Sequence, residues 1–579
     1  MRANSKVISR RLQTPEAKLD GMPERLGAIL CSRGIQQPDE LLFSNRDLES
    51  PASLSNVSEA AHLVCDHVRQ GSTIVIVGDY DADGATSCAL SVLALRQMGA
   101  ARVEYVVPDR FKHGYGLSPA LVEDALALQP ELLITVDNGI ASLAGVAHAR
   151  KLSIDVVVTD HHLPGDSLPE ANSIVNPNLV GDLFPSKNLA GVGVVFYLLS
   201  MVRRLLESGN WFQQSRITPP NLAEFLDLVA LGTYADLVRL DRNNRILVAQ
   251  GLKRINAGRC RPGITALAEV AGKVPGALLA SDLGFQLAPR LNAAGRLEDI
   301  SLGIECLLAE DGETARRLAS HLDEINQARK QIENRMNQDA REALQALKAQ
   351  SAGDEACLCL YDESWHEGLV GLVASRLKER WSVPVVAFAR GDNGDLKGSA
   401  RSVQGVHIRD VLCEIDATQP GLIIRFGGHA MAAGLSIAEA DFSAFRTAWE
   451  KVLGAQRQQI EAANAIFSDG PLDAEIDDLG FIRQLKTIAP WGQGFPEPVF
   501  DGRFQVLEQR LVGEVHLKMV LRSLDSHRVV DAIHFRYLDH PGAPCENLER
   551  IHAAYRVDVN EYAGRVSPQL VVEYLQTCQ

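Results

Sequence analysis

The sequence of 579 residues predicts an α/β protein: a parallel-sheet domain is joined by a long helix to a smaller α/β domain, and an all-β domain of the OB type follows. Three observations predict this architecture. Apolar and amphipathic segments alternate after residue 72, a helical pattern without Gly or Pro runs through 313–351, and short strand-like runs dominate after residue 466. The chain is too long for one ordinary domain, so we expect three or four units.

The first block consists of short Val- and Ile-rich runs separated by amphipathic stretches such as 85–98 and 140–151. The runs are "STIVIVG", "ARVEYVV", "ELLITVD" and "IDVVVTD". Continuous apolar strands that alternate with helices are typical of a parallel sheet covered on both faces. Because ligands bind beyond the carboxyl ends of the strands in such sheets, the residues that follow each run are candidates for a site.

The later part of the chain predicts a connector helix, a second sheet and a barrel. Helical segments continue to about residue 310, and apolar positions then recur in 313–351 at spacings of three, four, seven and eight. This pattern predicts one helix of about 55–60 Å, which we interpret as a rigid connector. A second α/β block begins near residue 356 and contains "VPVVAF", "GSARS" and "IIRFGGHAMAAGLSI". The runs after residue 466, such as "HLKMVLRS", predict a small OB-type barrel.

The composition, with 46% hydrophobic and 23% charged residues, is that of a soluble globular protein. The longest apolar run, "LAGVGVVFYLLSMV", is too short to span a bilayer and predicts a buried helix. No apolar segment follows the basic N-terminus, so we expect no secretory signal. The ten cysteines are scattered without a CxxC pair, which favours a cytoplasmic protein without a disulfide framework or a zinc site. The net charge of -15 counts against nucleic-acid binding only when it is taken alone, because a carboxylate metal site adds negative charge.

Three carboxylates follow the first apolar run, in the stretch "VGDYDADGAT". If this segment is extended, Asp79, Asp81 and Asp83 point in the same direction. Three like charges on one face repel each other, so one would take up a proton unless a cation lies among them. Gly78 and Gly84 allow the tight turn that a cation site needs. A calcium loop of EF-hand type is the alternative, but it requires flanking helices and a Glu at position 12, where this chain has Leu.

Further candidate ligands come from neighbouring segments. Asp137 and the pair His161 and His162 follow two other strands, and Asp236 follows a helical segment. Mixed Asp and His ligands suit Mn²⁺ or Mg²⁺ better than Zn²⁺. There are more ligands than one ion needs, and two ions about 3.5–4 Å apart would use them all. That arrangement is typical of phosphoester cleavage.

These motifs resemble those of the DHH phosphoesterase superfamily. "VGDYDADG", "VDNG", "TDHH" and "GTYADLV" look like its four motifs, and "GSARS" and "GGHAMAAG" look like its DHHA1 substrate domain. "HGYGLS", "APRLNAAGR", "WHEGLVGLVASRL" and "PWGQGFPEPVF" resemble the longer bacterial RecJ proteins in particular. The resemblance runs from about residue 50 to the C-terminus. The resemblance implies an N-terminal segment (1–55), a DHH catalytic domain (56–310), a connector helix (311–352), a DHHA1 domain (353–458) and an OB-like nucleic-acid-binding domain (459–579).

The resemblance implies a single-strand-specific DNA exonuclease that works from 5′ to 3′ with two Mn²⁺ or Mg²⁺ ions and releases 5′-mononucleotides in recombination and repair. It implies roles for eight residues: Asp81, Asp83, Asp137, His161 and Asp236 would be metal ligands, with Asp137 the bridge; Asp79 would be a ligand or support; His162 would contact the scissile phosphate; and Asp160 would orient the histidines. The chain departs from the family at Tyr234, where a small aliphatic residue is expected.

The substrate side is predicted from glycines and arginines near the other motifs. Gly427 and Gly428 free the backbone to approach a phosphate, which Arg401 can also bind, although an ordinary turn explains the glycines as well. Arg110 and Arg290 are candidates for gripping a 5′ phosphate, whereas arginines beside turns are more often surface charges. The predicted substrate-binding residues are Arg110, His113, Tyr115, Arg290, Asn292, Arg296, Ser399, Arg401, Gly428 and His429.

The predicted β domain contains several aromatic residues, most of which must lie in its core. One or two exposed rings that stack on bases would suffice for sequence-independent binding of a single strand. The sequence does not distinguish the exposed rings from the buried ones. The candidates are Trp491, Phe495, Phe504, Phe535, Tyr537, Tyr555 and Tyr562.

Three other functions compete with an exonuclease. A pyrophosphatase or a phosphodiesterase of short oligonucleotides needs only the two α/β blocks, so the extra β domain favours a polymer substrate. A non-catalytic DNA-binding relative would be expected to lose ligands, but every ligand position is filled here. A tRNA-synthetase editing domain lacks the four-motif first half. The expected partners are single-stranded DNA and, as further candidates, a helicase and the single-strand-binding protein; no membrane contact is expected of this cytoplasmic chain, which we expect to be a monomer.

Overall fold

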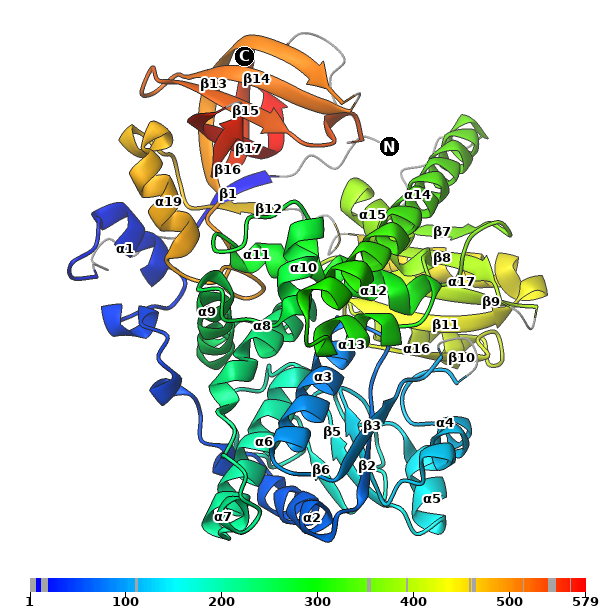
Figure 1. Cartoon of the computed structure of the whole chain (residues 1–579). Helices are drawn as coiled ribbons and strands as arrows, with labels where there is room; N and C mark the ends of the chain where they lie inside the picture. The colour runs from blue at the N-terminus through cyan, green and yellow to red at the C-terminus, as the bar shows by residue number, and fades with distance from the viewer. Residues whose placement is uncertain are drawn as a thin grey trace. The chain divides into compact units, whose positions relative to one another are not determined.

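Figure 1 shows the computed structural model, which describes residues 7–11, 19–109, 113–350, 356–391, 394–457, 460, 465–513, 515–539, 548–562 and 564–578. The chain forms two compact units, and each unit combines segments that are distant in sequence. Unit 1 comprises 1–34, 329–486 and 498–579, and unit 2 comprises 35–328 and 487–497. The predicted N-terminal segment is therefore shared between the two units.

Unit 2 contains the predicted parallel sheet, in the order β3-β2-β4-β5-β6. Its strands are β2 (Thr73–Val77), β3 (Arg102–Val106), β4 (Leu132–Val136), β5 (Asp155–Thr159) and β6 (Ser173–Val175). All neighbours pair in parallel. The four predicted strands are confirmed, whereas β6 was not predicted because three residues are too few to show a periodicity.

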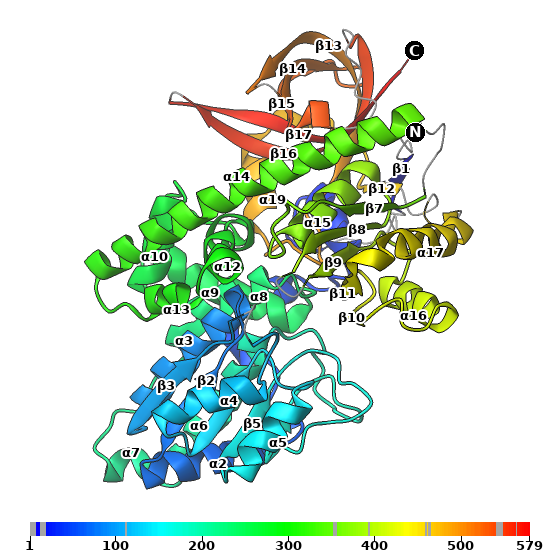
Figure 2. The same ribbon diagram turned by 90° about the vertical axis from the view of Figure 1, so that its right-hand side faces the viewer.

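Helices cover both faces of this sheet. Buried side chains of β2, β4 and β5 pack with α4 (Pro119–Ala125) and α5 (Leu143–Lys151), which lie in front of the sheet in Figure 2. The opposite face packs against α3 (Ala82–Gln97) and α6 (Gly191–Ser208). α6 is the predicted buried helix, and no helix in the described part of the chain is long and apolar enough to cross a membrane.

The remaining helices of unit 2 follow the sheet or precede it in the chain. They are α2 (Val57–Gln70), α7 (Trp211–Gln214), α8 (Leu226–Ala235), α9 (Arg242–Asn256), α10 (Pro262–Val270), α11 (Ala280–Asp282), α12 (Ala288–Leu297) and α13 (Ser301–Leu308). The segment 487–497 also belongs here, since the Tyr234 hydroxyl donates to Trp491 O at 2.7 Å. Trp491 and Phe495, which the sequence assigned to the β domain, therefore pack in unit 2. Tyr234 thus replaces the expected aliphatic residue with a side chain that holds this segment.

The predicted connector is one helix, α14 (Gly312–Gln350). Its residues up to 328 belong to unit 2 and those from 329 onward to unit 1. In unit 1 the buried carboxylate of Glu333 accepts from Arg329 at 2.8 Å and from Arg376 at 3.0 Å. Arg376 lies on α15 (Val370–Trp381), so this ion-pair cluster fixes α14 to the helix that follows it.

The second predicted sheet, in unit 1, has the order β10-β11-β9-β8-β7. Only β7 and β8 are parallel. Its strands are β7 (Leu358–Tyr361), β8 (Val385–Arg390), β9 (Asp395–Arg401), β10 (Arg425–Gly428) and β11 (Ala432–Ala438), and its helices besides α15 are α16 (Ile408–Thr418) and α17 (Phe442–Ala455). The predicted boundary between residues 458 and 459 falls outside the described residues.

The C-terminal strands close into a barrel in the order β13-β14-β15-β17-β16, which confirms the predicted OB-type domain. The strands are β13 (Phe500–Val512), β14 (His516–Ser523), β15 (Val529–His534), β16 (Arg550–Tyr562) and β17 (Arg565–Thr577), and the helix before them is α19 (Leu479–Thr487). Residues on β14 alternate between the barrel interior, as Leu517 and Met519 do, and its outer face.

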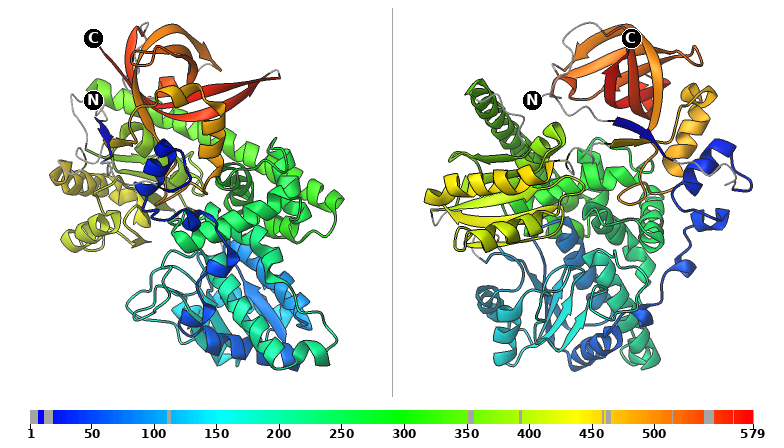
Figure 3. Two further views of the ribbon diagram at one scale, coloured as in Figure 1. Left: turned by 90° about the vertical axis from the view of Figure 1, so that its left-hand side faces the viewer. Right: turned by 180° about the vertical axis from the view of Figure 1, so that it is seen from behind.

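The N-terminal strand β1 (Val7–Arg10) pairs in parallel with β12 (Ala465–Ser468), and the two strands lie side by side in Figure 3. The Arg10 guanidinium donates two hydrogen bonds, of 3.0 and 2.9 Å, to the Asp501 carboxylate. Burial acts to raise the pKa of Asp501, but this pair and the hydrogen bonds from Ser468 and His552 outweigh it and lower the pKa to about 2. α1 (Glu24–Cys31) follows in the same unit. No sequence periodicity predicts this pairing, because the two strands are separated by more than 450 residues.

Candidate metal centre

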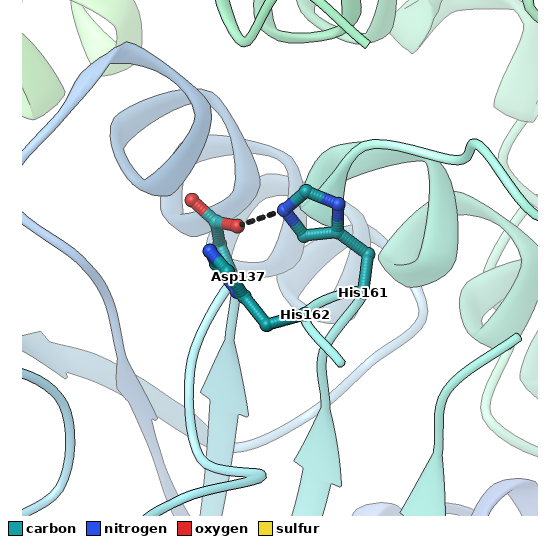
Figure 4. A group of neighbouring side chains, drawn as sticks. All are labelled: Asp137, His161 and His162. Atoms are coloured by element: carbon teal, nitrogen blue, oxygen red, sulfur yellow. Dashed lines mark ion pairs between the residues drawn. The ribbon is translucent and has the colours of Figure 1, made fainter. Parts of the chain in front are cut away.

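The predicted ligands meet where β2, β4 and β5 end, and Asp236 joins them from the end of α8. Figure 4 shows the His161 ring aimed at the Asp137 carboxylate, with His162 beside them. Potential ligand atoms lie within 4.8 Å of one another in three groups: Asp137, His161 and His162; Asp83, His161 and Asp236; and Asp79, Asp81 and Asp137. All six predicted metal ligands therefore converge, together with His162.

The expectation of an extended Asp79–Asp83 segment was wrong, because β2 ends at Val77 and α3 begins at Ala82. Asp81 is the N-cap of α3, and its Oδ1 accepts from the amides of Asp83 at 2.9 Å and Gly84 at 3.1 Å. Capping satisfies amides that a helix leaves unpaired at its first turn, which favours this conformation over an extended one. The carboxylates converge through a tight turn into a helix and not through strand alternation.

Asp83 is held by the beginning of α6. Its two carboxylate oxygens accept from the amides of Gly191 at 2.6 Å and Val192 at 2.9 Å. Glycine is required here because a Cβ on Gly191 would lie 2.5 Å from the Cβ of Asp137. The sequence analysis did not single out Gly191. Its only local signal is a glycine at the start of an apolar helix, which is weak without the tertiary structure.

Asp137 has the left-handed backbone conformation, with φ of 62°. The next residue, Asn138, is fully buried, and its side-chain amide donates to Val77 O at 3.0 Å and Val136 O at 2.9 Å. This amide ties the ends of β2 and β4 together, so it sets the spacing between the two aspartate-bearing loops. A left-handed non-glycine residue stores strain that the surrounding contacts must balance, and such residues often lie at functional sites.

Asp160 is buried beneath the two histidines. Its Oδ1 accepts from the amides of His161 at 2.7 Å and His162 at 3.0 Å and lies 2.7 Å from Nδ1 of His162. Its Oδ2 accepts from the amide of Ile140 at 2.9 Å. Four contacts on one carboxylate fix both the loop and the imidazole, which supports the predicted orienting role of Asp160.

Two asparagines that the sequence analysis did not name hold the same loop from its carbonyl side. The Asn176 side chain donates to His162 O at 2.9 Å, and the Asn178 side chain donates to His161 O at 2.6 Å. Asn176 also accepts from the amide of Asn178 at 2.7 Å, which links the two residues. The signal in the sequence is the stretch "VNPN", which begins at the last residue of β6.

We predict that Asn176→Ala weakens metal binding without unfolding the protein. The change frees the His162 carbonyl and the turn at Asn178, and partners of this kind typically contribute about 10- to 100-fold to metal affinity or activity. Titration calorimetry with Mn²⁺ measures the affinity, and thermal unfolding of the apoprotein checks the fold. Asn45→Ala, at an exposed position, serves as the control. Unchanged Mn²⁺ affinity in Asn176→Ala would show that the clamp is not needed for the site.

The electrostatics of the cluster favour a cation. Burial, together with the charges of Asp83 and Asp81, raises the pKa of Asp137 and of Asp236 well above the ordinary carboxylate range. Burial and the neighbouring Asp81 raise the pKa of Asp83 to about 7. Carboxylates packed this closely repel one another unless a positive charge lies among them. The buried Oδ1 of Asp137 also accepts no hydrogen bond from the described residues and lies 3.1 Å from Nε2 of His161. These carboxylate and imidazole donors fit Mn²⁺ or Mg²⁺.

The pKa values of His162 and Asp160 are shifted in opposite directions. Burial lowers the pKa of His162, but the hydrogen bond and charge of Asp160 outweigh burial and raise that pKa to about 9. Burial acts to raise the pKa of Asp160, and His162 outweighs it, so that pKa falls below its ordinary value. The contact between His162 and Asp160 therefore favours the charged form of both groups.

Tyr115 is the predicted substrate residue that lies at the cluster. Its hydroxyl lies 3.4 Å from the ring nitrogens of His162 and 3.3 Å from Asp137 O, and its ring meets the His162 ring edge-on at 5.9 Å. The side chain is 46% exposed, so it remains accessible to a ligand. Arg110, the neighbouring candidate, lies outside the described residues.

His113 and Asn292, two further predicted substrate-binding residues, make contacts within the protein. His113 is buried, with Nε2 2.9 Å from Asp124 and Nδ1 accepting from the Asp109 amide at 3.0 Å. Asn292 accepts from the amide of Ala82 at 2.7 Å and so buttresses the aspartate turn from α12. The sequence motifs marked these two loops as substrate-binding but did not indicate which partner each side chain meets within the protein.

Arg290, predicted to bind a 5′ phosphate, is engaged by groups of the protein itself. Its buried guanidinium pairs with Asp323 of α14 at 2.8 Å and donates to the carbonyls of Gln286 and Val270. A guanidinium engaged in this way anchors α14 to α12 and is not displayed to a ligand. Arg296 lies half-buried near the end of α12.

The remaining substrate predictions lie in the second sheet. On β9, Arg401 donates to Ser399 Oγ at 2.8 Å and to Ala400 O at 2.8 Å. Burial lowers its pKa, and no carboxylate pairs with it in the described part of the chain. Gly428 and His429 lie at the turn between β10 and β11, where the His429 amide donates to Ala432 O at 2.8 Å. Gly428 has φ of 149°, which a side chain would disfavour.

Comparisons with known proteins follow the same division of the chain. Family models match at 73–233 (DHH family, N-terminal domain), 354–455 (DHHA1 domain) and 468–574 (RecJ OB domain). The single-stranded-DNA-specific exonuclease RecJ of Dickeya dadantii is 49% identical over 567 residues, which cover 98% of each chain. The Escherichia coli protein of the same name is 48% identical over 95% of this chain and 96% of its own. A crystal structure of RecJ in complex with Mn²⁺ from Thermus thermophilus superposes with a TM-score of 0.77 at 28% identity, covering all of this chain and 80% of the other.

Proposed function

This chain belongs to the RecJ family of single-stranded-DNA-specific exonucleases, within the DHH phosphoesterases, and from that premise we propose that it removes 5′-mononucleotides from the 5′ end of single-stranded DNA with two divalent cations. The observation that carries the proposal is the sharing of ligands. Asp137 belongs both to the group with Asp79 and Asp81 and to the group with the two histidines. A carboxylate shared in this way fits the bridge between two ions.

The metal ligands in this proposal are Asp79, Asp81, Asp83, Asp137, His161 and Asp236, with Mn²⁺ or Mg²⁺ as the ions. Bound divalent cations would stabilise the negative charge that develops on the phosphate oxygens and would lower the pKa of the attacking water. The amides of α6, the cap of α3 and Asn138 hold these carboxylates close together for this purpose. A divalent cation also removes the repulsion that raises the pKa of Asp137 and Asp236.

His162 is the residue that contacts the scissile phosphate in this proposal. Asp160 keeps its imidazole protonated and fixed in orientation, so it can donate a charge-assisted hydrogen bond to a non-bridging phosphate oxygen. Tyr115, whose hydroxyl lies within 3.4 Å of the His162 ring, stands beside the nucleotide. In this proposal, His162 and Tyr115 bind and orient the substrate.

Arg401 is the best candidate for a further phosphate contact, because a half-buried arginine without a carboxylate partner among the described residues is a ready anion site. A Cβ on Gly371, the second residue of α15, would lie 2.7 Å from its guanidinium, so the glycine leaves room beside it. Ser399, Gly428 and His429 are proposed to complete the DNA-binding surface of this sheet.

We predict that Arg401→Ala raises the KM for 5′-phosphorylated single strands by about 10- to 150-fold, because a hydrogen bond to a charged group contributes about 1.5–3 kcal/mol. Steady-state degradation of a labelled oligonucleotide measures this change. Arg409→Ala, which removes an exposed arginine from α16 of the same domain, provides the control. An unchanged KM in Arg401→Ala would move the phosphate contact elsewhere.

The proposed function is tested by incubating the protein with Mn²⁺ and four substrates: linear single strands labelled at either end, circular single strands, duplex DNA and pyrophosphate. We expect mononucleotides from the 5′ end of linear single strands and no attack on the other substrates. If label at the 3′ end is released first, the enzyme degrades DNA from 3′ to 5′, and the proposed direction is wrong. Cleavage of pyrophosphate or only of short oligonucleotides would replace the exonuclease with a small-substrate phosphodiesterase.

The partners and setting follow from the same proposal. Single-stranded DNA is the substrate, and a helicase and the single-strand-binding protein are the proteins that would supply and protect it. We propose that the chain acts as a monomer in the cytoplasm, in DNA recombination and repair. The nine described cysteines are all free thiols, which suits a reducing compartment.

A further inference from the structure

The barrel exposes one of the aromatic side chains that the sequence left undecided. Phe535 is 51% exposed, although a large apolar side chain gains free energy from burial. The other candidates whose side chains are described are buried: Trp491, Phe495, Phe504, Tyr537 and Tyr555. The side chain of Tyr562 lies outside the described residues.

The backbone after β15 places Phe535 outside the barrel. His534 is buried, and its ring meets that of buried Tyr537 edge-on at 5.4 Å. Between these two residues, Arg536 has the left-handed conformation with φ of 54°. The chain therefore turns at Arg536 and returns to the core at Tyr537, so Phe535 is left in solvent by a defined turn.

His516 supports the exposed ring. The ring centroids of His516 and Phe535 are 5.5 Å apart with an angle of 77° between the planes, which is the favourable edge-to-face arrangement. Nδ1 of His516 accepts from the Arg536 amide at 2.8 Å, so the imidazole itself is fixed. A supported ring loses less conformational entropy when it binds a ligand than a freely rotating one.

Basic residues lie beside Phe535 in the part of the barrel that the structure describes. Lys518 lies two residues from His516 on the outer face of β14, and Arg510 of β13 pairs with it across the strands. Lys518 approaches a carboxylate, that of Asp531, only to 3.9 Å. The acidic Glu508 and Asp531 lie one row further from Phe535. Among the side chains that the structure describes on this face, Arg510 and Lys518 therefore lie nearer the exposed ring than Glu508 and Asp531 do.

We propose that Phe535, supported by His516 and flanked by Arg510, Lys518 and Arg536, is a stacking platform for a base of single-stranded DNA. An exposed ring next to basic groups is the combination by which proteins bind single strands without reading their sequence. The flanking cations contact the phosphates on either side of the stacked base. This inference rests on the proposed function, because it assigns a contact to the same substrate.

The test measures binding of the full-length protein to a fluorescent 30-nucleotide poly-dT strand in EDTA, which separates binding from cleavage. We expect Phe535→Ala to weaken the affinity by about 5- to 150-fold, the range that corresponds to loss of one base–aromatic stack. Phe535→Trp should retain near-normal affinity, whereas Phe535→Leu, which keeps apolar surface without an aromatic face, should not. Phe467→Ala, at another exposed phenylalanine of unit 1 (47% exposed), is the matched control.

The outcomes separate this inference from the proposed function. If wild-type protein degrades single strands but Phe535→Ala binds poly-dT within twofold of wild type, the platform is wrong and the exonuclease stands. If Phe535→Leu binds poly-dT as tightly as Phe535→Trp does, the contact depends on apolar surface and not on stacking. The inference is then also overturned. Equal thermal unfolding of all variants rules out a folding defect. If the wild-type protein does not degrade linear single strands in Mn²⁺, the proposed function fails independently of the binding data.

Discussion

Asp137→Asn is expected to abolish degradation of single-stranded DNA while the protein remains folded. Asp137 contributes to two of the three groups of ligand atoms, so this one substitution removes negative charge from both. A divalent cation supplies several kcal/mol of transition-state stabilisation, and about 4 kcal/mol corresponds to about a 1,000-fold loss of rate. We therefore expect at least this loss in kcat, with weaker binding of Mn²⁺ in titration calorimetry.

The same variant should bind single strands almost normally in EDTA, because the barrel and the second sheet are proposed to supply most of the contacts with DNA. Thermal stability without metal should not fall, because the asparagine relieves repulsion among buried carboxylates whose pKa values are raised. Asp66→Asn, at an exposed aspartate of α2, is the control. Turnover near the wild-type level in Mn²⁺ would contradict the assignment of Asp137 as the shared ligand.

His162→Ala is expected to lower kcat by about 100- to 1,000-fold with little change in KM. This is the usual cost of removing one preorganised donor to a developing negative charge. Asp160→Asn should lower kcat by about 10- to 100-fold through loss of orientation and charge support for the imidazole. Steady-state kinetics on a 5′-phosphorylated oligonucleotide give both parameters.

The double variant distinguishes orientation from an independent role for Asp160. If Asp160 acts through His162, the double variant should be no slower than His162→Ala alone, because groups that act as a unit are not additive. His148→Ala, which removes a partly exposed imidazole paired with Glu123, is the matched control and should have normal kcat. Additive losses of kcat would mean that Asp160 acts on the metal ligands independently of His162. It could do so through the hydrogen bond that it accepts from the His161 amide.

The sequence by itself determined the two sheets, the connector helix, the barrel and the position of the site. Hydrophobic periodicity is a local property, and the rule that parallel sheets bind ligands at their carboxyl ends converts strand positions into site positions. For that reason the sequence alone places "VGDYDADG", "VDNG" and "TDHH" at one edge of the parallel sheet. All six predicted metal ligands lie in that cluster.

The tertiary structure alone decided what each polar side chain meets. Arg290, His113 and Asn292 lie in motif loops, yet each is engaged by a partner distant in the chain: Asp323, Asp124 and the Ala82 amide. The pairing of β1 with β12, the asparagine clamp of the histidine loop and the exposure of Phe535 are of the same kind. Periodicity reports which face of an element is buried, but a hydrogen bond or an exposed ring depends on which distant groups the fold places beside it, and that information is not local in the sequence.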